Sequence, residues 1–206
     1  MAPVATLERD LPPAHGSRPP ADPGRPRPAV ASPVLGMLFF LGSEAMFFAA
    51  LISAFLVLRA GAGAWPPPGQ PRLPVALTGV STAVLLASGV TMAWARRASG
   101  DVLAGRLGMT AALGAVFLAV QGSEWVRLVG HGLTLASSLY ASTFYTLIGC
   151  HGVHVLGGLA VLVVVWRRAV AGGWAGGDRG GLDAAALYWW FVVGVWPILY
   201  ALVYFA

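Results

Sequence analysis

The sequence of 206 residues contains no lysine, a single cysteine and few acidic residues. All 13 basic side chains are therefore arginine, and charged residues of both signs make up only 10% of the chain. Soluble domains usually carry about 25% charged residues, so this composition argues against a soluble protein. The one cysteine, Cys150, excludes an intrachain disulfide and a metal site built from several cysteines.

Hydrophobic residues make up 57% of the chain and gather in five long stretches. Each stretch reaches the roughly 20 residues that an α-helix needs to cross about 30 Å of hydrocarbon. We therefore expect an all-α integral membrane bundle of five transmembrane helices, filling residues 34-206 and leaving no room for a separate soluble enzyme domain. The expected spans are 34–58, 73–95, 107–129, 139–166 and 184–205.

Residues 1-33 differ from the rest, because they contain many prolines and few large apolar side chains. Such a composition predicts a disordered, Pro-rich tail. The alternative is a cleavable secretory signal, with Ala60, Ala62 and Ala64 after the first apolar stretch. That stretch is longer than the apolar region of a signal peptide, which favours a permanent helix.

The arginines are distributed unequally between the two sides of the predicted bundle. With five spans, ten of them fall on the side of the N-terminus and three on the other. Because arginine-rich segments stay in the cytoplasm, we expect the N-terminus in the cytoplasm and the C-terminus outside. The net charge of +5 is explained by this asymmetry, so no nucleic-acid partner is expected. The three arginines on the side away from the N-terminus are Arg59, Arg72 and Arg127.

Three ionisable side chains fall deep inside the predicted spans. Glu44 lies about ten residues into the first span, roughly 15 Å from its start. His151 and His154 are three residues apart and share one face of the fourth span, at a similar depth. Because an unpaired ionisable group in hydrocarbon costs several kcal/mol, we expect Glu44 to lie within hydrogen-bonding reach of one of these histidines, forming a buried polar cluster.

This cluster admits several interpretations. The carboxyl group of Glu44 could relay protons, contact lipid, or simply lock two helices together through a hydrogen bond. A metal site is a further hypothesis, but two histidines and one carboxylate form a thin ligand set, and haem ligation fits still less well. The sequence therefore assigns no catalytic, cofactor-binding or metal-binding residue to this chain.

A second polar pair lies near the outer end of the third span. Glu124 and Arg127 have the spacing of an ion pair on one helix and could also contact lipid headgroups or a partner subunit. In the second span, the four-residue spacing of Gly79, Ala83 and Ala87 predicts close approach of a neighbouring helix.

Three segments resemble the third subunit of cytochrome c oxidase, in the same order. LFFLGSEAMFF resembles the family's Ser-Glu helix, through Ser43, Glu44, Met46, Phe47 and Phe48. STFYTLIGCHGVHV resembles its most recognisable segment, and VQGSEWV the Gln and Glu-aromatic segment just before it. The resemblance covers residue 34 to the C-terminus and matches the short, five-helix form of the family.

The last helix departs from the family pattern. The family usually has Tyr-Trp-His-Phe-Val-Asp-Val-Val-Trp there, whereas this chain has Trp190 and Val193 in place of the histidine and the aspartate. Any role that depends on those two polar groups is not expected here.

The resemblance implies a non-catalytic subunit of a haem-copper terminal oxidase in the bacterial cytoplasmic (inner) membrane. It would pack against core subunit I, together with subunit II, and the haem and copper would lie in the core subunit. The family is thought to hold structural phospholipid, to support proton uptake and to protect the enzyme during turnover. A quinol oxidase or a nitric-oxide reductase could use a similar chain, and a stand-alone proton-coupled transporter is an alternative of another class.

Overall fold

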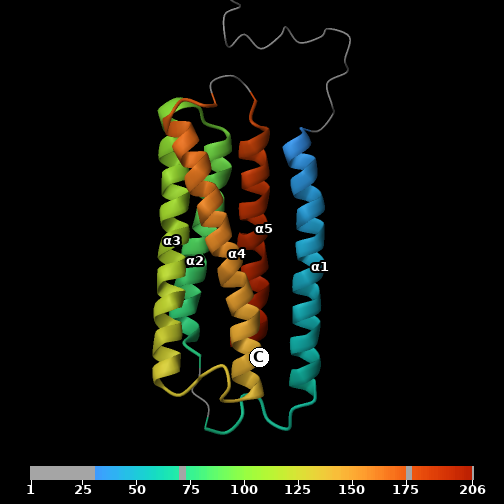
Figure 1. The fold of residues 1–206 in the computed structure, drawn as a ribbon. Coiled ribbons are helices and arrows are strands. Elements are labelled where there is room, and N and C mark those ends of the chain that lie inside the picture. Colours follow the sequence, from blue (N-terminus) through green and yellow to red (C-terminus); the bar gives the residue numbers. More distant parts are fainter. Residues whose placement is uncertain (1–30, 70–72, 175–177, 206) are drawn as a thin grey trace, which may run out of the picture.

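The computed structural model describes residues 31–69, 73–174 and 178–205, and its only regular secondary structure in these ranges is helical (Figure 1). Each of the five helices is long and apolar enough to cross a membrane, which confirms the predicted all-α bundle and makes the chain a multi-pass membrane protein. The helices are α1 (Ser32–Ala60), α2 (Val75–Arg96), α3 (Gly100–Gly130), α4 (Leu139–Val170) and α5 (Gly180–Tyr204).

Four of the observed helices are longer than the predicted apolar spans, whereas α2 begins two residues later and ends one residue later than the predicted span 73–95. The helix α3 begins at Gly100 rather than at 107, because its first two turns are more polar than the hydrocarbon-crossing part. The helix α1 begins at Ser32, inside the expected tail, with Pro33 in its first turn. Proline is tolerated there, since the first helical N–H groups have no partner within the helix. Most of the predicted tail, residues 1–30, lies outside the described residues.

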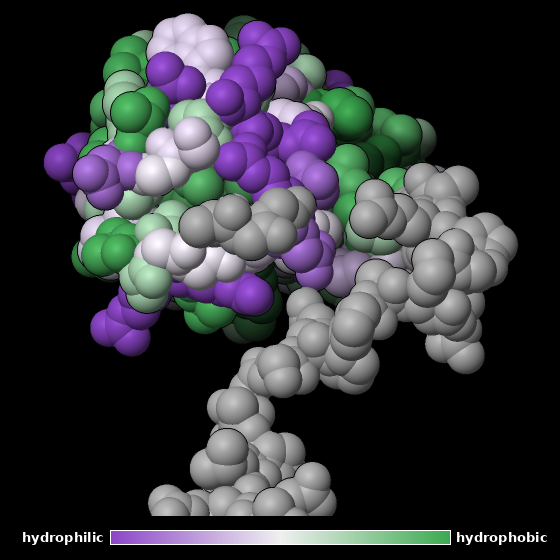
Figure 2. Space-filling view, turned by 90° about the horizontal axis from the view of Figure 1, so that it is seen from above, coloured by the Kyte–Doolittle hydropathy of each residue, from purple (hydrophilic) through white to green (hydrophobic). Residues whose placement is uncertain are grey.

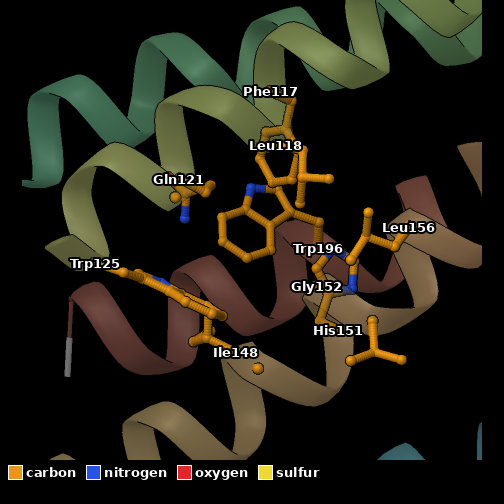
Figure 3. Close-up of a pocket in the computed structure, with 12 residues that line it drawn as sticks. Phe117, Leu118, Gln121, Trp125, Ile148, His151, Gly152, Leu156 and Trp196 are labelled. Carbon is orange, nitrogen blue, oxygen red and sulfur yellow. The ribbon is translucent and has the colours of Figure 1, made fainter.

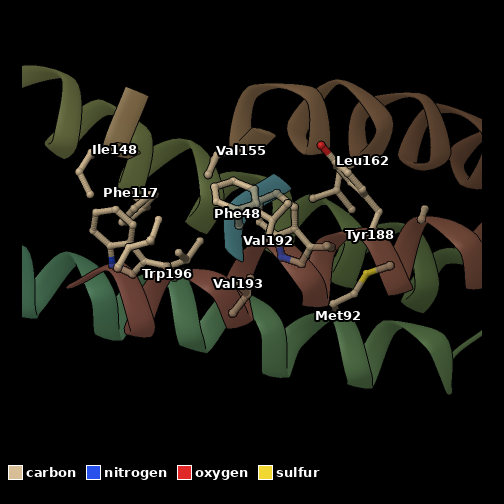
Figure 4. Close-up of a cluster of buried hydrophobic side chains, with 14 of the residues drawn as sticks. Phe48, Met92, Phe117, Ile148, Val155, Leu162, Tyr188, Val192, Val193 and Trp196 are labelled. Atoms are coloured by element: carbon tan, nitrogen blue, oxygen red, sulfur yellow. The ribbon is translucent and has the colours of Figure 1, made fainter. Parts of the chain in front are cut away.

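The helix α5 is the centre of the bundle. It packs against α1, α2 and α4, whereas α1 contacts only α4 and α5. The ribbon shows α1 at one side of the other four helices (Figure 1). Only Phe48 and Phe55 of α1 are buried, so α1 depends on few contacts. The large side chains of the core come from all five helices (Figure 4).

The aromatic side chains of α5 donate hydrogen bonds to α2. The Trp189 indole donates to Ser88 Oγ at 3.1 Å, and the Trp196 indole donates to Thr82 Oγ1 at 2.8 Å. The Trp190 indole donates to the Gly89 carbonyl oxygen at 3.0 Å. Because no water satisfies such groups within hydrocarbon, these bonds fix the orientation of α5 against α2.

The hydroxyl-bearing face of α2, rather than the expected small-residue face, therefore meets its neighbours. Ala83 and Ala87 are exposed, so the prediction that they allow close helix approach is wrong. Gly79 does face a neighbour, because a Cβ atom at this position would lie 3.0 Å from the Tyr200 hydroxyl oxygen. The physical reason is that a polar donor on α5 needs an acceptor on α2, which alanine cannot supply.

The Trp189 ring lies between two glycines. A Cβ atom at Gly114 of α3 would lie 2.6 Å from Trp189 Cη2, and one at Gly158 of α4 would lie 2.9 Å from Trp189 Cε3. The ring is fully buried, so it joins α5 to both α3 and α4. Both glycines are needed because their missing side chains leave the space that the indole fills.

One end of the bundle is rich in arginine. There Arg96 forms an ion pair with Asp183, Nη2 to Oδ1 at 2.7 Å, and Arg179 Nη1 donates to the Arg96 carbonyl oxygen. Figure 2 looks down on this end, where hydrophilic residues gather across the tops of the helices. The described arginines at this end are Arg96, Arg97, Arg106, Arg167, Arg168 and Arg179, against Arg59 and Arg127 at the other.

The glycine beside Trp189 provides a test of this packing. We expect Gly114→Ala to lower the free energy of unfolding by about 1–3 kcal/mol, because its methyl group would overlap the indole ring. Gly105→Ala is the matched control on α3, since nothing lies within 4 Å of its Cβ position. The control should be neutral or stabilising by up to about 1 kcal/mol through helix propensity. Equal thermal stability of the two purified variants would contradict the described packing.

Candidate functional site

Glu44 of α1 and His154 of α4 form a hydrogen-bonded pair inside the bundle. Glu44 Oε2 lies 2.8 Å from His154 Nε2, and their side chains are 17% and 16% exposed. The helices α1 and α4 run in opposite directions (Figure 1). Glu44 and His154 both lie near the middle of their helices, so they meet at a similar depth. We call these two residues the Glu44–His154 pair.

The hydrogen-bond partner of the second ring nitrogen of His154 shows which atoms of the pair carry protons. His154 Nδ1 lies 2.7 Å from the carbonyl oxygen of Cys150. A carbonyl oxygen only accepts, so Nδ1 must carry a proton. His154 Nε2 then either accepts from a protonated Glu44 or, as part of an imidazolium ion, donates to a carboxylate. In both cases the contact holds one proton and the pair has no net charge, which lowers the cost of placing it in a membrane.

Aromatic side chains surround the pair. The ring centroid of His154 lies 5.0 Å from that of Phe48 and 6.0 Å from that of Phe47. The Tyr188 hydroxyl of α5 donates to the His154 carbonyl oxygen at 3.1 Å. The pair is the only side-chain hydrogen bond from α1 to another helix among the described residues. It therefore positions α1, whose other contacts are apolar.

His151 does not join this hydrogen bond. Its side chain is almost fully buried, and its ring stacks on Trp196 with centroids 5.0 Å apart and at 29°. Phe48 and Phe117 approach the same ring edge-on. Neither ring nitrogen has a hydrogen-bond partner within the described part of the chain. The two histidines thus share one face of α4 but have different surroundings.

The described residues contain no group of three or more His, Cys, Asp or Glu side chains that could hold a metal ion. A structural zinc site, for comparison, uses four such ligands. The Glu44–His154 pair supplies two groups that already satisfy each other. Its chemistry is to hold a proton and to join two helices.

Glu124 and Arg127 form an ion pair on α3, with Oε1 and Nη1 2.9 Å apart. The side chain of Glu124 is 6% exposed and that of Arg127 is 66% exposed. Burial thus places the carboxylate inside the bundle, while the guanidinium group lies at its surface. An exposed arginine at a helix end can reach a headgroup or another subunit without leaving Glu124.

Trp190 and Val193, at the positions where the family pattern has histidine and aspartate, both pack on α2. A Cβ atom at Gly89 would lie 3.2 Å from Val193 Cγ1, and the Trp190 ring also lies 5.1 Å from the Arg96 guanidinium carbon. Val193 therefore contributes apolar packing to the α2–α5 contact, and Trp190 contributes its indole hydrogen bond to the Gly89 carbonyl oxygen.

The buried hydroxyl groups of α2 and α3 were not among the residues predicted from the sequence. Thr91 Oγ1 and Thr110 Oγ1 lie 2.9 Å apart, and Ser81 Oγ donates to Gln121 Oε1 at 3.4 Å. Thr78, Ser81, Thr82, Ser88 and Thr91 fall on one face of α2 at helical spacing, and this pattern would have indicated the polar face.

The Glu44–His154 pair can be tested with two substitutions. We expect Glu44→Ala to lower the free energy of unfolding by about 1–3 kcal/mol, because it leaves His154 Nε2 without a partner. Glu44→Gln should retain most of the stability, since the amide can donate to the same nitrogen of a neutral imidazole. Thermal unfolding of the purified variants measures both effects. Equal losses in Ala and Gln would mean that the carboxylate charge, rather than the hydrogen bond, positions α1.

The family model and the relatives that match this chain all carry the same description. The family model described as cytochrome c oxidase subunit III matches residues 24–206. The chain is 39% identical over 176 residues to cytochrome c oxidase subunit 3 of Synechocystis sp., covering 83% of this chain and 74% of the relative. It is 37% identical over 176 residues to the same subunit of Thermostichus vulcanus, covering 83% and 86%. For Lumbricus terrestris the identity is 36% over 182 residues, covering 82% and 68%. The chain belongs to the cytochrome c oxidase subunit III family.

Proposed function

We propose that this chain is the non-catalytic third subunit of a haem-copper cytochrome c oxidase in a bacterial inner membrane. Family membership over residues 24–206 is the observation that carries this proposal. The complex is an oxidoreductase, and this subunit takes part without performing the redox reaction itself. Its partners would be core subunit I and subunit II, together with bound phospholipid.

The proposed division of labour follows from the side chains present. The described residues do not bring together a ligand set for a metal ion, so the haem and copper would be held by the core subunit. The subunit can act on that centre only indirectly, through contacts, bound lipid and the protons near its partner. The Glu44–His154 pair is the one place in α1 where a proton is held deep in the bundle, and we propose that it supports proton uptake by the core subunit.

Two other functions are less well supported. Subunits of quinol oxidases or nitric-oxide reductases could share the fold, but the relatives from Synechocystis sp., Thermostichus vulcanus and Lumbricus terrestris are all named for cytochrome c oxidase. A stand-alone transporter would be expected to have repeated halves and broken helices around a midplane site. The Glu44–His154 pair lies instead between two continuous helices, α1 and α4.

The orientation of the bundle is also a proposal. The Arg-rich end, where α2 and α4 finish, would face the cytoplasm, and the C-terminal end of α5 would face outward. Lipid would then contact the flanks of the helices, and the arginines would lie at the cytoplasmic headgroups.

Removal of the subunit tests its role. A subunit-depleted oxidase should retain its haem spectrum and its initial turnover rate but lose activity faster during sustained turnover. The physical reason is that the subunit shapes the surroundings of the redox centre and does not bind it. The measurement is oxygen consumption followed over many turnovers, with the same preparation reconstituted with the subunit as control. Immediate loss of haem would assign the subunit to assembly of the redox site, and an unchanged lifetime would contradict a protective role.

Cysteine labelling tests the orientation. Ser99→Cys, between α2 and α3, and Ser137→Cys, between α3 and α4, are both exposed and lie at opposite ends of the bundle. In intact cells, a membrane-impermeant maleimide should label position 137 and should label position 99 only after permeabilisation. Labelling in the reverse order would invert the proposed orientation.

A further inference from the structure

A pocket lies between α3 and α4, away from the Glu44–His154 pair. Its volume is about 120 Å³, and α5 closes its inner side with Trp196 (Figure 3). Phe117 and Trp125 of α3 and His151 of α4 supply the other rings around this space. Four of the twelve lining residues therefore carry rings, and most of the others are aliphatic residues or glycines.

Several residues that line this pocket carry buried nitrogens without partners. Both ring nitrogens of His151, the indole nitrogen of Trp125 and the amide nitrogen of Gln121 are buried and lack a hydrogen bond within the described ranges. His151 is 1% exposed. Leaving such groups unpaired in a low-dielectric interior is unfavourable, so a bound group that forms hydrogen bonds with them would be stabilised.

The pocket opens toward the flank of the bundle that lipid would contact. Its rim includes the exposed residues Gly122, Val153 and Leu156, which lie within the apolar part of α3 and α4. A molecule that enters by this route must first dissolve in hydrocarbon. Because most of the wall is apolar, a mostly apolar molecule with one polar group fits this space better than water.

The depth of His151 in the membrane distinguishes a phospholipid from a molecule that dissolves in the hydrocarbon. His151 lies about 18 Å from the start of α4, and the helix exceeds a 30 Å hydrocarbon layer by about 9 Å at each end when centred. The imidazole is then roughly 9 Å inside the hydrocarbon. The ester carbonyl groups of a phospholipid stay at the boundary, because its charged headgroup does. They could reach Trp125 near the end of α3, but not His151.

We propose that this pocket binds a neutral, membrane-dissolved molecule with a flat apolar ring and a carbonyl or hydroxyl oxygen, the chemistry of a quinone. The ring would lie among Phe117, Trp125 and Trp196, and the oxygen would hydrogen-bond with His151. Offset or edge-on ring contacts stabilise such a ligand beyond the effect of burial alone. The proposal concerns binding and includes no redox step.

Photolabelling of the intact oxidase complex tests the proposal. The probe is a short-chain quinone that carries an azido group, and excess unlabelled quinone is the competitor. We expect competable labelling of the peptides around 117–125 and 148–156. Gly152→Leu should reduce it about tenfold or more, because a Cβ atom there lies 3.5 Å from Trp125 Cη2 and the longer side chain fills the pocket. Gly105→Leu adds the same volume at an open position and should leave the labelling unchanged.

A second variant addresses the hydrogen bond. His151→Leu removes the ring nitrogens without adding a charge and should reduce labelling about tenfold. Absence of competable labelling in the unmodified complex would overturn the proposal without any variant, and so would labelling that Gly152→Leu leaves intact. Labelling of the pocket by a photoactivatable phospholipid instead of the quinone would overturn it in favour of lipid. Co-purification of this chain with the oxidase core is measured separately. If the chain did not co-purify with the core, the proposed function would fail, whereas absence of labelling in an intact complex would count only against the quinone site.

Discussion

The structure depends on one constraint: within hydrocarbon, a polar group must find its partner inside the protein. The Trp189, Trp190 and Trp196 indoles of α5 each carry one N–H donor, and each finds an acceptor on α2. Apolar packing alone discriminates poorly between helix faces in lipid, because lipid tails are as apolar as leucine. The three indole bonds discriminate well, since rotating α5 would break all of them. They make α5 the helix on which the other elements are arranged.

The helix α1 obeys the same constraint with a single pair. It buries only Phe48 and Phe55, so apolar contact gives it little rotational preference. The Glu44–His154 hydrogen bond supplies that preference, and the buried Phe48 ring packs against His154 beside it. One residue therefore serves two purposes, because the carboxyl group that fixes α1 is also the group that can hold a proton. A structural role and a role in proton uptake need not exclude each other.

The sequence predicted the five helices and the partnership of Glu44 with a histidine for clear physical reasons. Span length follows from bilayer thickness, and depth follows from the rise per residue. Rotation about each helix axis was much less predictable. Ala83 and Ala87 of α2 suggested a packing face but are exposed, because small residues permit contact without requiring it. The indole N–H groups of α5 require it, since each needs an acceptor and finds it on α2, a helix about a hundred residues away in the sequence. Such pairings become visible only once the helices are placed together.

The two histidines of α4 show that helical spacing predicts a shared face but not shared neighbours. His151 and His154 are one turn apart, and spacing alone would give them one environment. The rotation of about 60° between them is enough to separate their neighbours. His154 faces α1 and is satisfied by Glu44, whereas His151 faces Trp196 and Phe117 and has no partner in the part of the chain described. Its burial therefore conflicts with the constraint that the hydrogen-bonded side chains of the bundle obey, as does the burial of the Gln121 and Trp125 nitrogens beside it. A conflict of this kind is resolved most directly by an oxygen atom from outside the chain, and the adjoining pocket gives that atom a place.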